Sequence, residues 1–484
     1  IPTSFIIDGV EKISANYSFL GLPRENAKFR DATIMADGDL ASGTFGTIDV
    51  RETRLLFGAN NCIGARNGGV FKTKALSFNA ENANSASNHL TFANGGVWQN
   101  VNAKPSHLDI PFKGTAKGHR VEFLDGGTLS GFDGLYVNNG SLFRVVFSGS
   151  DTAIDIEAGS DVSKLNGVSN RLEVVNGAKV RFLDSNGTGK ARFWLGTFAG
   201  SDGNVIRIDG EGSLLELAAS GTLVGQYSGQ GNGIEVANKG ELIVNNLQVG
   251  RGKWSDAEKA NPETYRWADH NYVTVSSGGR ITDVGITYVG YGDAPLRDSR
   301  LTVISNGIVS NQQMIVGNSM YALSNVVLVA DGGVLLTKGD ATVANGKNAG
   351  FGNRVTVGTN GTFVAGNLYS HLTTIQAQSL HFFHHKVGIG LSDLEKRELL
   401  HQVNAPHFNA RVGLAVQHVD DFCRYDAIHP TGIDEHARES RLCLPAALFL
   451  PSFLAVAFLA WLFRHLLYFL RIGVVFHETV DFQT

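Results

Sequence analysis

An eleven-residue phrase that recurs along the chain constrains the fold more than any other feature of the sequence. It reads Asn, then apolar residues at its third and fifth positions, then one or two glycines, then another apolar residue. Its copies begin at Asn88, His119, Asn170, Asn204, Asn232, Asn271, Ser299, Asn325 and Asn353, with a looser copy from Asp133. Several successive copies start 28 residues apart, as Asn204 and Asn232 do. Repetition at a period of roughly 20 to 50 residues indicates a solenoid, a propeller or another array.

Each phrase also predicts its own local structure. Apolar residues two positions apart, such as Leu172 and Val174, lie on the same side of an extended strand, and Glu173 between them faces the other way. The glycine that follows can adopt the positive φ that a tight corner requires. Between phrases comes a second short apolar unit that ends in glycine, as in TLVG at Gly225 and LQVG at Gly250. Every period therefore supplies two or three short strands separated by glycine corners.

Two arrangements of these strands are compatible with the pattern. A strand, an Asn-Gly pair and another strand also signal an antiparallel hairpin, so a row of hairpins or a propeller is the alternative. A unit of about 28 residues cannot bury its apolar face alone, whereas copies stacked at a strand spacing of about 4.8 Å form one continuous core. We therefore predict an all-β chain with a right-handed parallel β-helix over residues 81–366.

Composition agrees with this fold and narrows the range of partners. Glycine accounts for 58 of 484 residues, charged residues for 18%, and the formal net charge is −4. No basic stripe with interleaved aromatic residues occurs, so we expect no nucleic-acid partner. The cysteines, Cys62, Cys423 and Cys443, are too sparse for a disulfide framework and lack metal-ligand spacing. We expect no cofactor and no metal.

Residues 1–80 contain strand-like runs with weak echoes of the phrase, and we predict that they form irregular first turns or a cap. The chain begins at Ile1, and its first residues show no basic segment followed by an apolar stretch. This start is compatible with a removed signal peptide or with a fragment of a longer protein.

The composition changes sharply after the repeats. Eleven of the 15 histidines lie at or beyond His371, and residues 367–441 read as a polar linker. A hydrophobic tail at residues 442–472 contains one uncharged run, Leu442 to Phe463, long enough for a helix that crosses a bilayer. Three interpretations are open: a membrane anchor followed by arginines, a buried helix pair, or a tail translated out of frame. His381, His384 and His385 could bind a metal, but a solvated segment is the preferred interpretation.

The repeated phrases and the intervening glycine units resemble those in the passenger regions of autotransporter-like surface proteins, particularly those built from autotransporter-associated β-strand repeats. The resemblance covers roughly residues 80–366. It implies a secreted or surface-exposed β-helical stalk of a Gram-negative type of bacterium, with an adhesive or structural role. A glycan or a host cell-surface ligand is the implied partner.

A polysaccharide-degrading lyase or hydrolase is the alternative function, because parallel β-helices often cleave polysaccharides. Pectin-cleaving members resemble one another through Asn-Thr-Asp, Asp-Asp, Gly-His-Gly and Arg-Ile-Lys sequences that place carboxylates around a water. None of these occurs in the repeats, and the Asp420-Asp421 pair lies in the tail. Outward acids are present at Asp155, Glu157, Glu173 and Glu216, but strand alternation alone places them in solvent. We therefore expect no catalytic residues.

One insertion interrupts the regular spacing. From Asn232 to Asn271 the interval grows to 39 residues, and the added segment is rich in aromatic and charged side chains. Loops that leave a regular scaffold often carry recognition. The candidate ligand-binding residues are Trp254, Asp256, Glu258, Tyr265, Arg266, Trp267 and Asp269. They could form an aromatic platform for a sugar or a protein, or the aromatic rings could only pack the loop onto the scaffold.

Overall fold

The computed structural model describes residues 4–7, 12–20, 33–55, 60–79, 86–101, 106–113, 117–157, 163–184, 192–198, 200–217, 221–227, 229–254, 259–261, 267–344, 350–370, 376–377 and 380–389. The chain divides into two compact units, Ile1–His384 and His385–Thr484. Within the described part, no helix is long and apolar enough to span a bilayer. The predicted apolar run from Leu442 to Phe463, and the 367–441 linker beyond residue 389, lie outside the described residues.

The first strand of every turn joins a single sheet. Among the described residues this sheet has 15 strands, and each strand pairs in parallel with the strands of the turns before and after it. In order they are β1 (Ser4–Ile7), β3 (Thr33–Asp39), β6 (Cys62–Arg66), β8 (His89–Ala93), β11 (Arg120–Leu124), β14 (Arg144–Ser148), β17 (Arg171–Val175), β20 (Val205–Asp209), β23 (Gly233–Ala237), β26 (Tyr272–Val275), β30 (Arg300–Val303), β34 (Val326–Val329), β36 (Arg354–Val357) and β38 (Gln376–Ala377). The remaining strand, β4 (Thr44–Phe45), forms an antiparallel hairpin with β3.

The second and third strands of each turn form a 22-stranded sheet over the same described ranges. Long strands such as β7 and β35 contribute to both positions and make the sheet continuous. The second strands are β9 (Val97–Asn100), β12 (Thr128–Ser130), β15 (Ala153–Glu157), β18 (Lys179–Leu183), β21 (Leu214–Leu217), β24 (Glu241–Val244), β27 (Arg280–Asp283) and β31 (Ile308–Asn311). The third strands are β10 (Ser106–Lys113), β13 (Phe132–Ser141), β16 (Ser163–Val168), β19 (Phe193–Leu195), β22 (Thr222–Gln226), β25 (Leu247–Gly252), β28 (Ile286–Gly292) and β32 (Gln313–Val316). The long strands are β2 (Lys12–Leu20), β5 (Thr47–Leu55), β7 (Val70–Asn79), β35 (Val334–Val343), β37 (Thr362–Ser370) and β39 (Leu380–Ile389).

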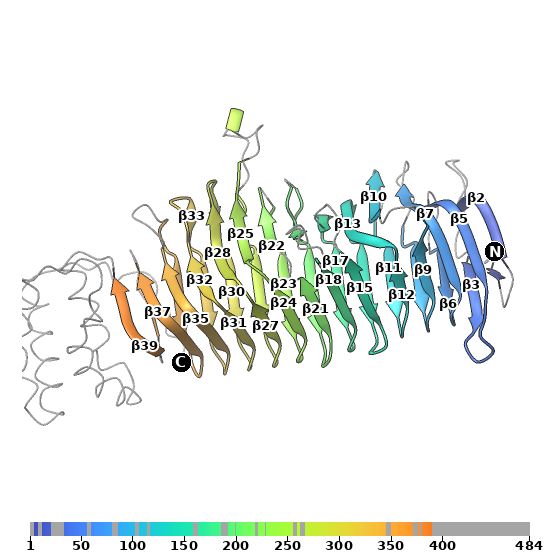
Figure 1. Ribbon diagram of the computed structural model, residues 1–484. Coiled ribbons are helices and arrows are strands. Elements are labelled where there is room, and N and C mark those ends of the chain that lie inside the picture. The colour runs from blue at the N-terminus through green and yellow to red at the C-terminus, as the bar shows by residue number, and fades with distance from the viewer. Residues whose placement is uncertain are drawn as a thin grey trace, which may run out of the picture. The chain divides into compact units, whose positions relative to one another are not determined.

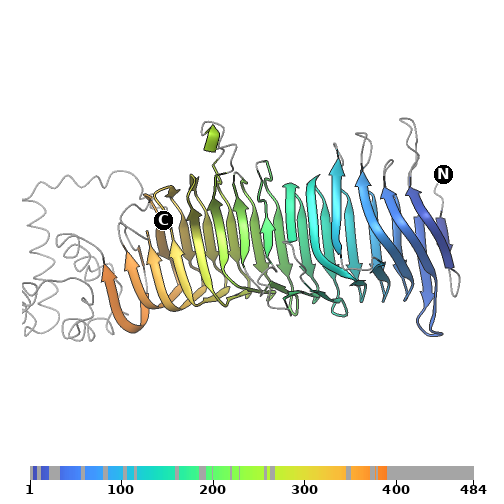
Figure 2. The ribbon, with the colours of Figure 1, turned by 45° about the horizontal axis from the view of Figure 1, so that its top comes forward.

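The predicted parallel β-helix is therefore confirmed, and the hairpin array is wrong. Successive turns lie side by side with their strands in register, as Figure 1 and Figure 2 show from two directions. A short two-stranded sheet, β29 (Leu296–Arg297) with β33 (Ala322–Leu323), adds to the corners of two later turns. The right-handed sense follows the strong preference of parallel crossover connections and stays a prediction.

The apolar residues of the phrases fill one continuous interior. Leu172 and Val174 are fully buried, and they belong to a single core cluster that runs from Ala36 to Leu368. In the earlier turns this core contains stacked rings: Phe92 and Phe123 have centroids 5.3 Å apart, and Phe123 and Phe147 are 5.1 Å apart. Repetition at the same strand position places identical side chains one above another, and aromatic pairs in such contact add stability beyond their buried area.

The first residue of the phrase forms a ladder inside the solenoid. The side-chain oxygen of Asn232 accepts the backbone N–H of Asn204 at 3.0 Å and its Nδ2–H at 2.9 Å, and the side-chain oxygen of Asn204 accepts the backbone N–H of Asn170 at 3.1 Å. All three asparagines are fully buried. We call this set of stacked residues the asparagine ladder. Its members are Asn61, Asn88, Asn170, Asn204, Asn232, Asn271, Asn325 and Asn353, with His119 and Ser299 at two of the same positions.

The glycines that end the third strands lie against this ladder. Gly225 has a φ of 68°, and a Cβ added to it would overlap the amide group of Asn271. Gly196, Gly290 and Gly317 stand in the same relation to Asn232, Asn325 and Asn353. The two recurring sequence signals, the leading asparagine and the apolar unit ending in glycine, therefore meet in space, because only glycine leaves room for the stacked amide and tolerates this backbone conformation.

Ser299 is a weak point of the ladder. Its hydroxyl is buried and has no hydrogen-bond partner among the described residues, although its own N–H donates to Asn325 Oδ1 at 3.1 Å. We expect Ser299→Asn to stabilise the protein by about 1 kcal/mol, because an amide there can bond to both neighbouring rungs. Chemical denaturation of the two proteins measures the difference. Equal or lower stability of the variant would show that the site beside Gly250 does not accept the larger side chain.

His119 makes stability depend on pH. Burial lowers the pKa of this histidine from 6.5 to about 4, and its Nδ1 accepts the N–H of Asn88 at 3.2 Å. As the pH falls below 6.5, His119 takes up a proton in the unfolded chain but stays neutral in the folded chain until the pH approaches 4. The contribution of neutral His119, about 3 kcal/mol, is therefore present above pH 6.5 and is lost between pH 6.5 and 4.

His119→Asn keeps an acceptor in the ladder and removes the titrating group. We expect the variant to lose stability less steeply than the natural protein between pH 6.5 and 4. Unfolding free energies measured at several pH values test this. The reference is pH 8, where the imidazole of His119 is neutral in both the folded and the unfolded natural protein. Parallel curves for the two proteins would mean that other groups control the acid sensitivity.

Candidate functional site

The insertion predicted from the sequence leaves the solenoid at the corner between β25 and β26, where the short green cylinder formed by described residues of the insertion stands apart from the strands in Figure 1 and Figure 2. Of its seven candidate residues, Trp254, Trp267 and Asp269 are described, and they lie at the two ends of the insertion. The other four candidates, Asp256, Glu258, Tyr265 and Arg266, lie outside the described residues. The structure thus describes the base of the insertion, which is the outgoing end with Trp254 and the returning end with Trp267 and Asp269.

The outgoing end of the insertion is fixed to the next turn. Trp254 is half-buried, and its indole Nε1–H donates to the backbone carbonyl of Asp293 at 3.0 Å. The ammonium of the preceding Lys253 lies 5.8 Å from the ring centroid of Tyr227, on the turn before. Trp254 therefore links its own turn to the following one, and Lys253 reaches back to the turn before.

The returning end of the insertion carries a linked set of three side chains. The Nε–H of Arg297 donates to Asp269 Oδ2 at 3.0 Å, and the guanidinium lies 5.0 Å from the ring centroid of Trp267. Asp269 is 4% exposed, whereas about half of the Arg297 side chain is exposed. Burial raises the pKa of Asp269 above its usual value, although the hydrogen bond and charge of Arg297 oppose that shift. The buried carboxylate holds the cation over the indole ring.

The backbone at this end is tied to the preceding turn. Gln230 Nε2–H donates to the carbonyl of Trp267 at 2.9 Å, and the N–H of Gly231 donates to the carbonyl of Asp269 at 3.0 Å. Ala268 between them is fully buried and packs with Leu296 and Ala322 in a small separate cluster. The aromatic residues of the base are therefore held on ordered backbone, as a recognition site requires.

Two partners in this site were missed by reasoning from the sequence. Arg297 lies 28 residues after Asp269, which is the period of the repeat, and Gln230 lies one turn before. Projecting each insertion residue by one period in both directions is the signal that would have found them.

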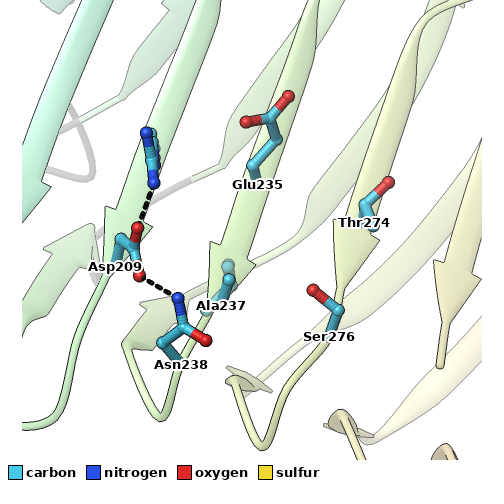
Figure 3. Close-up of a pocket in the computed structure, with 8 residues that line it drawn as sticks. Asp209, Glu235, Ala237, Asn238, Thr274 and Ser276 are labelled. Atoms are coloured by element: carbon cyan, nitrogen blue, oxygen red, sulfur yellow. Dashed lines mark hydrogen bonds and ion pairs between the residues drawn. The ribbon is translucent and has the colours of Figure 1, made fainter. Parts of the chain in front are cut away.

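A second candidate is a shallow hollow of about 220 Å³ on the outer face of the first sheet, shown in Figure 3. It is lined by β20, β23, β26 and the residues that follow them, and it contains the carboxylates of Asp209 and Glu235. Asp209 pairs with Arg207 and accepts Asn238 Nδ2–H at 2.7 Å. Glu235 accepts the hydroxyl of Tyr272 at 2.9 Å, and burial together with the Glu235 charge raises the pKa of that phenol to about 12.

This hollow does not present the acid pair of a polysaccharide-cleaving enzyme. Both carboxylates already have hydrogen-bond donors within the protein, and a general acid must be able to reach a glycosidic oxygen. Within the described ranges, no group of three or more His, Cys, Asp or Glu side chains is arranged to hold a metal ion. The hollow is best explained as a surface ion-pair network over three turns.

The outward acids named from the sequence differ from one another in their surroundings. Asp155 is exposed and pairs with Arg181 at 2.6 Å, as expected for a solvated side chain. Glu173 was expected in solvent, and that expectation is wrong: it is 5% exposed and pairs with Arg144 of the preceding turn at 2.5 Å. Alternation correctly placed it on the outer side of the strand, but the long arginine side chain covers it.

Comparisons with known proteins complete the description of the site. No protein-family model matches the chain, and no curated protein matches its sequence. The crystal structure of a TibC-catalysed, hyper-glycosylated TibA fragment, residues 55–350, covers 80% of this chain and 93% of its own length. The identity is 12% and the TM-score is 0.37. A similarity this low supports neither a family assignment nor a shared function.

Proposed function

We propose that this protein is a non-catalytic, secreted or surface-exposed structural and adhesive protein of a Gram-negative type of bacterium, whose solenoid presents the insertion after β25 to a ligand. The observation that carries the proposal is the arrangement of Trp267 over Arg297 and buried Asp269. Cations also lie over aromatic rings elsewhere in the described part of the chain, as Lys164 does over Tyr136 and Arg251 over Tyr291. The set at the insertion differs because its cation, Arg297, is also paired with a buried carboxylate, that of Asp269. The ligand class is a glycan or a cell-surface protein.

Aromatic rings beside planar polar groups suit both kinds of ligand. A tryptophan ring supplies a large rigid contact surface at low entropic cost, and guanidinium and carboxylate groups hydrogen-bond to hydroxyl groups or to a peptide. Trp254 and Trp267 approach from opposite ends of the insertion and contact neighbouring turns. The two rings therefore mark the site irrespective of which ligand binds.

Changing both tryptophans tests the proposal. We expect the Trp254→Ala, Trp267→Ala protein to bind cells or arrayed glycans at least tenfold more weakly than the natural protein, because loss of an aromatic anchor costs about 2 kcal/mol or more. Trp194→Ala, on the outer face of a different turn, is the matched control and should leave binding unchanged. Thermal unfolding confirms that each variant is folded.

Undiminished binding by the folded double variant would reject the site. The same samples incubated with polysaccharides address the enzymatic alternative through released reducing ends or unsaturated products. Turnover of any polymer would reject a non-catalytic role.

A further inference from the structure

The corner that carries the insertion also carries an aromatic residue on each of six consecutive turns. This corner joins the third strand of one turn to the first strand of the next, along the upper edge of the rod in Figure 1. We call these residues the corner ridge: Phe198, Tyr227, Trp267, Tyr291, Tyr321 and Phe351. Phe198 is 45% exposed, Tyr321 41% and Phe351 81%, and the other three are half-buried.

Exposed apolar side chains concentrate on this one corner. Of nine large hydrophobic residues that are exposed within the described ranges, six lie there. They are Leu142, Val168, Phe198, Met320, Tyr321 and Phe351. Soluble proteins seldom align exposed apolar groups without a binding role. Because consecutive turns are spaced at about 4.8 Å, the six aromatic residues extend over about 25 Å along the axis.

Charge at the corner excludes a strongly ionic ligand. From Gly196 to Asn353 the described corner residues include four bases and four acids, so their formal charges cancel. They are Arg251, Lys253, Lys259 and Arg297, and Asp202, Asp269, Asp293 and Asp298. One of these cations, Arg297, is already paired with Asp269 at 3.0 Å. These described residues therefore create no net electrostatic potential that would attract a polyanion or a polycation.

The polar groups at the corner favour a ligand rich in hydroxyl groups. The guanidinium of Arg297 is about half exposed beside the ring of Trp267, and its N–H groups can donate to the hydroxyl oxygens of a sugar. Its pyranose faces stack on aromatic rings in the same way that ligands stack at other aromatic sites.

We infer that the corner ridge binds a linear, neutral polysaccharide along the solenoid axis, with several sugar units in contact at once. This inference rests on the proposed function and extends its site from one turn to six. A linear polymer matches the ridge because the ridge has one aromatic residue on each of six consecutive turns along the axis. Each additional sugar that reaches another turn adds contact without a new loss of translational freedom, so affinity rises with chain length.

A chain-length series tests the inference. The full-length protein is screened against immobilised linear neutral polysaccharides, and oligosaccharides of one to eight units from the polymer that binds are titrated by calorimetry. We expect affinity to rise at least tenfold between two units and six. Phe198→Ser and Phe351→Ser, at the two ends of the ridge, should weaken binding of the longest oligosaccharide at least threefold and leave the two-unit affinity unchanged. Phe45→Ser, exposed to 42% on the β3–β4 hairpin, is the matched control.

Four outcomes would overturn the inference. Binding that depends on Trp267 but not on chain length would confine the site to the insertion and leave the proposed function intact. Binding of acidic polymers alone would contradict the neutral charge argument. Concentration-dependent association abolished by Phe351→Ser, without glycan binding, would assign the ridge to a second copy of the chain. Failure to bind any glycan or cell would reject both the inference and the proposed function.

Discussion

Gly225→Ala is expected to destabilise the protein by about 4 kcal/mol, a large effect for a single methyl group. Two costs combine at this position. The backbone adopts a φ of 68°, which costs an L-residue about 1–2 kcal/mol, and the new Cβ overlaps the buried amide of Asn271. Relief of that overlap displaces a rung of the asparagine ladder, and overpacking of this kind costs about 1–3 kcal/mol.

Gly43→Ala separates the two costs. Gly43 has nearly the same backbone conformation, with a φ of 69°, but a Cβ there meets nothing within 4 Å. We expect this variant to lose only about 1 kcal/mol. Urea unfolding of both variants beside the natural protein gives the comparison. Similar losses for Gly43→Ala and Gly225→Ala would show that backbone strain dominates and that the ladder adapts freely.

Asn232→Ala is expected to cost about 3 kcal/mol. The side-chain oxygen of Asn232 accepts two hydrogen bonds from Asn204, at 3.0 Å from the backbone N–H and at 2.9 Å from Nδ2–H. Removing it leaves a fully buried backbone N–H without its acceptor, and an unsatisfied buried donor costs about 1–3 kcal/mol. The bond from Asn232 Nδ2–H to Asn271 Oδ1, at 3.2 Å, is lost as well, and the truncated side chain leaves a small cavity.

Thr274→Ala on the outer face of the next turn serves as the control for this variant. Its side chain is partly exposed, so its loss should change stability by no more than about 0.5 kcal/mol. Equilibrium unfolding by circular dichroism measures both proteins. A loss below 1 kcal/mol for Asn232→Ala would mean that a water molecule replaces the amide and that the ladder contributes little.

The sequence predicted the strands, the parallel stacking and the glycine corners because each depends on residues close together in the chain. Leu172 and Val174 alternate with Glu173 within one strand, and their burial follows from that alternation. The contact between Gly225 and Asn271 could not be predicted in the same way. It joins residues 46 positions apart across an insertion, and it depends on which turn of the solenoid lies next to which.

The residues of the candidate site likewise fall into those that the sequence predicted and those that it did not. Trp254, Trp267 and Asp269 were identified because the insertion disrupts a regular period. Arg297, which contacts both Trp267 and Asp269, was missed because it belongs to the following turn and lies in an otherwise ordinary segment. Contacts between neighbouring turns determine the packing of both the interior and the corner of this protein. The repeat period identifies the turns in the sequence, but it does not identify which residues of neighbouring turns contact each other.

The asparagine ladder also gives the rod a direction. At most rungs the buried backbone N–H belongs to the earlier turn and its side-chain acceptor to the later one, as for Asn170 with Asn204 and Asn325 with Asn353. The Nδ2–H groups of several ladder asparagines donate in the opposite sense, to carbonyls of the preceding turn, as Asn204 does to Gly167 at 2.8 Å and Asn271 to Gly229 at 3.0 Å. Removing a turn from either end of the ladder would therefore unpair a buried donor. Each inner turn is thus stabilised by both of its neighbours.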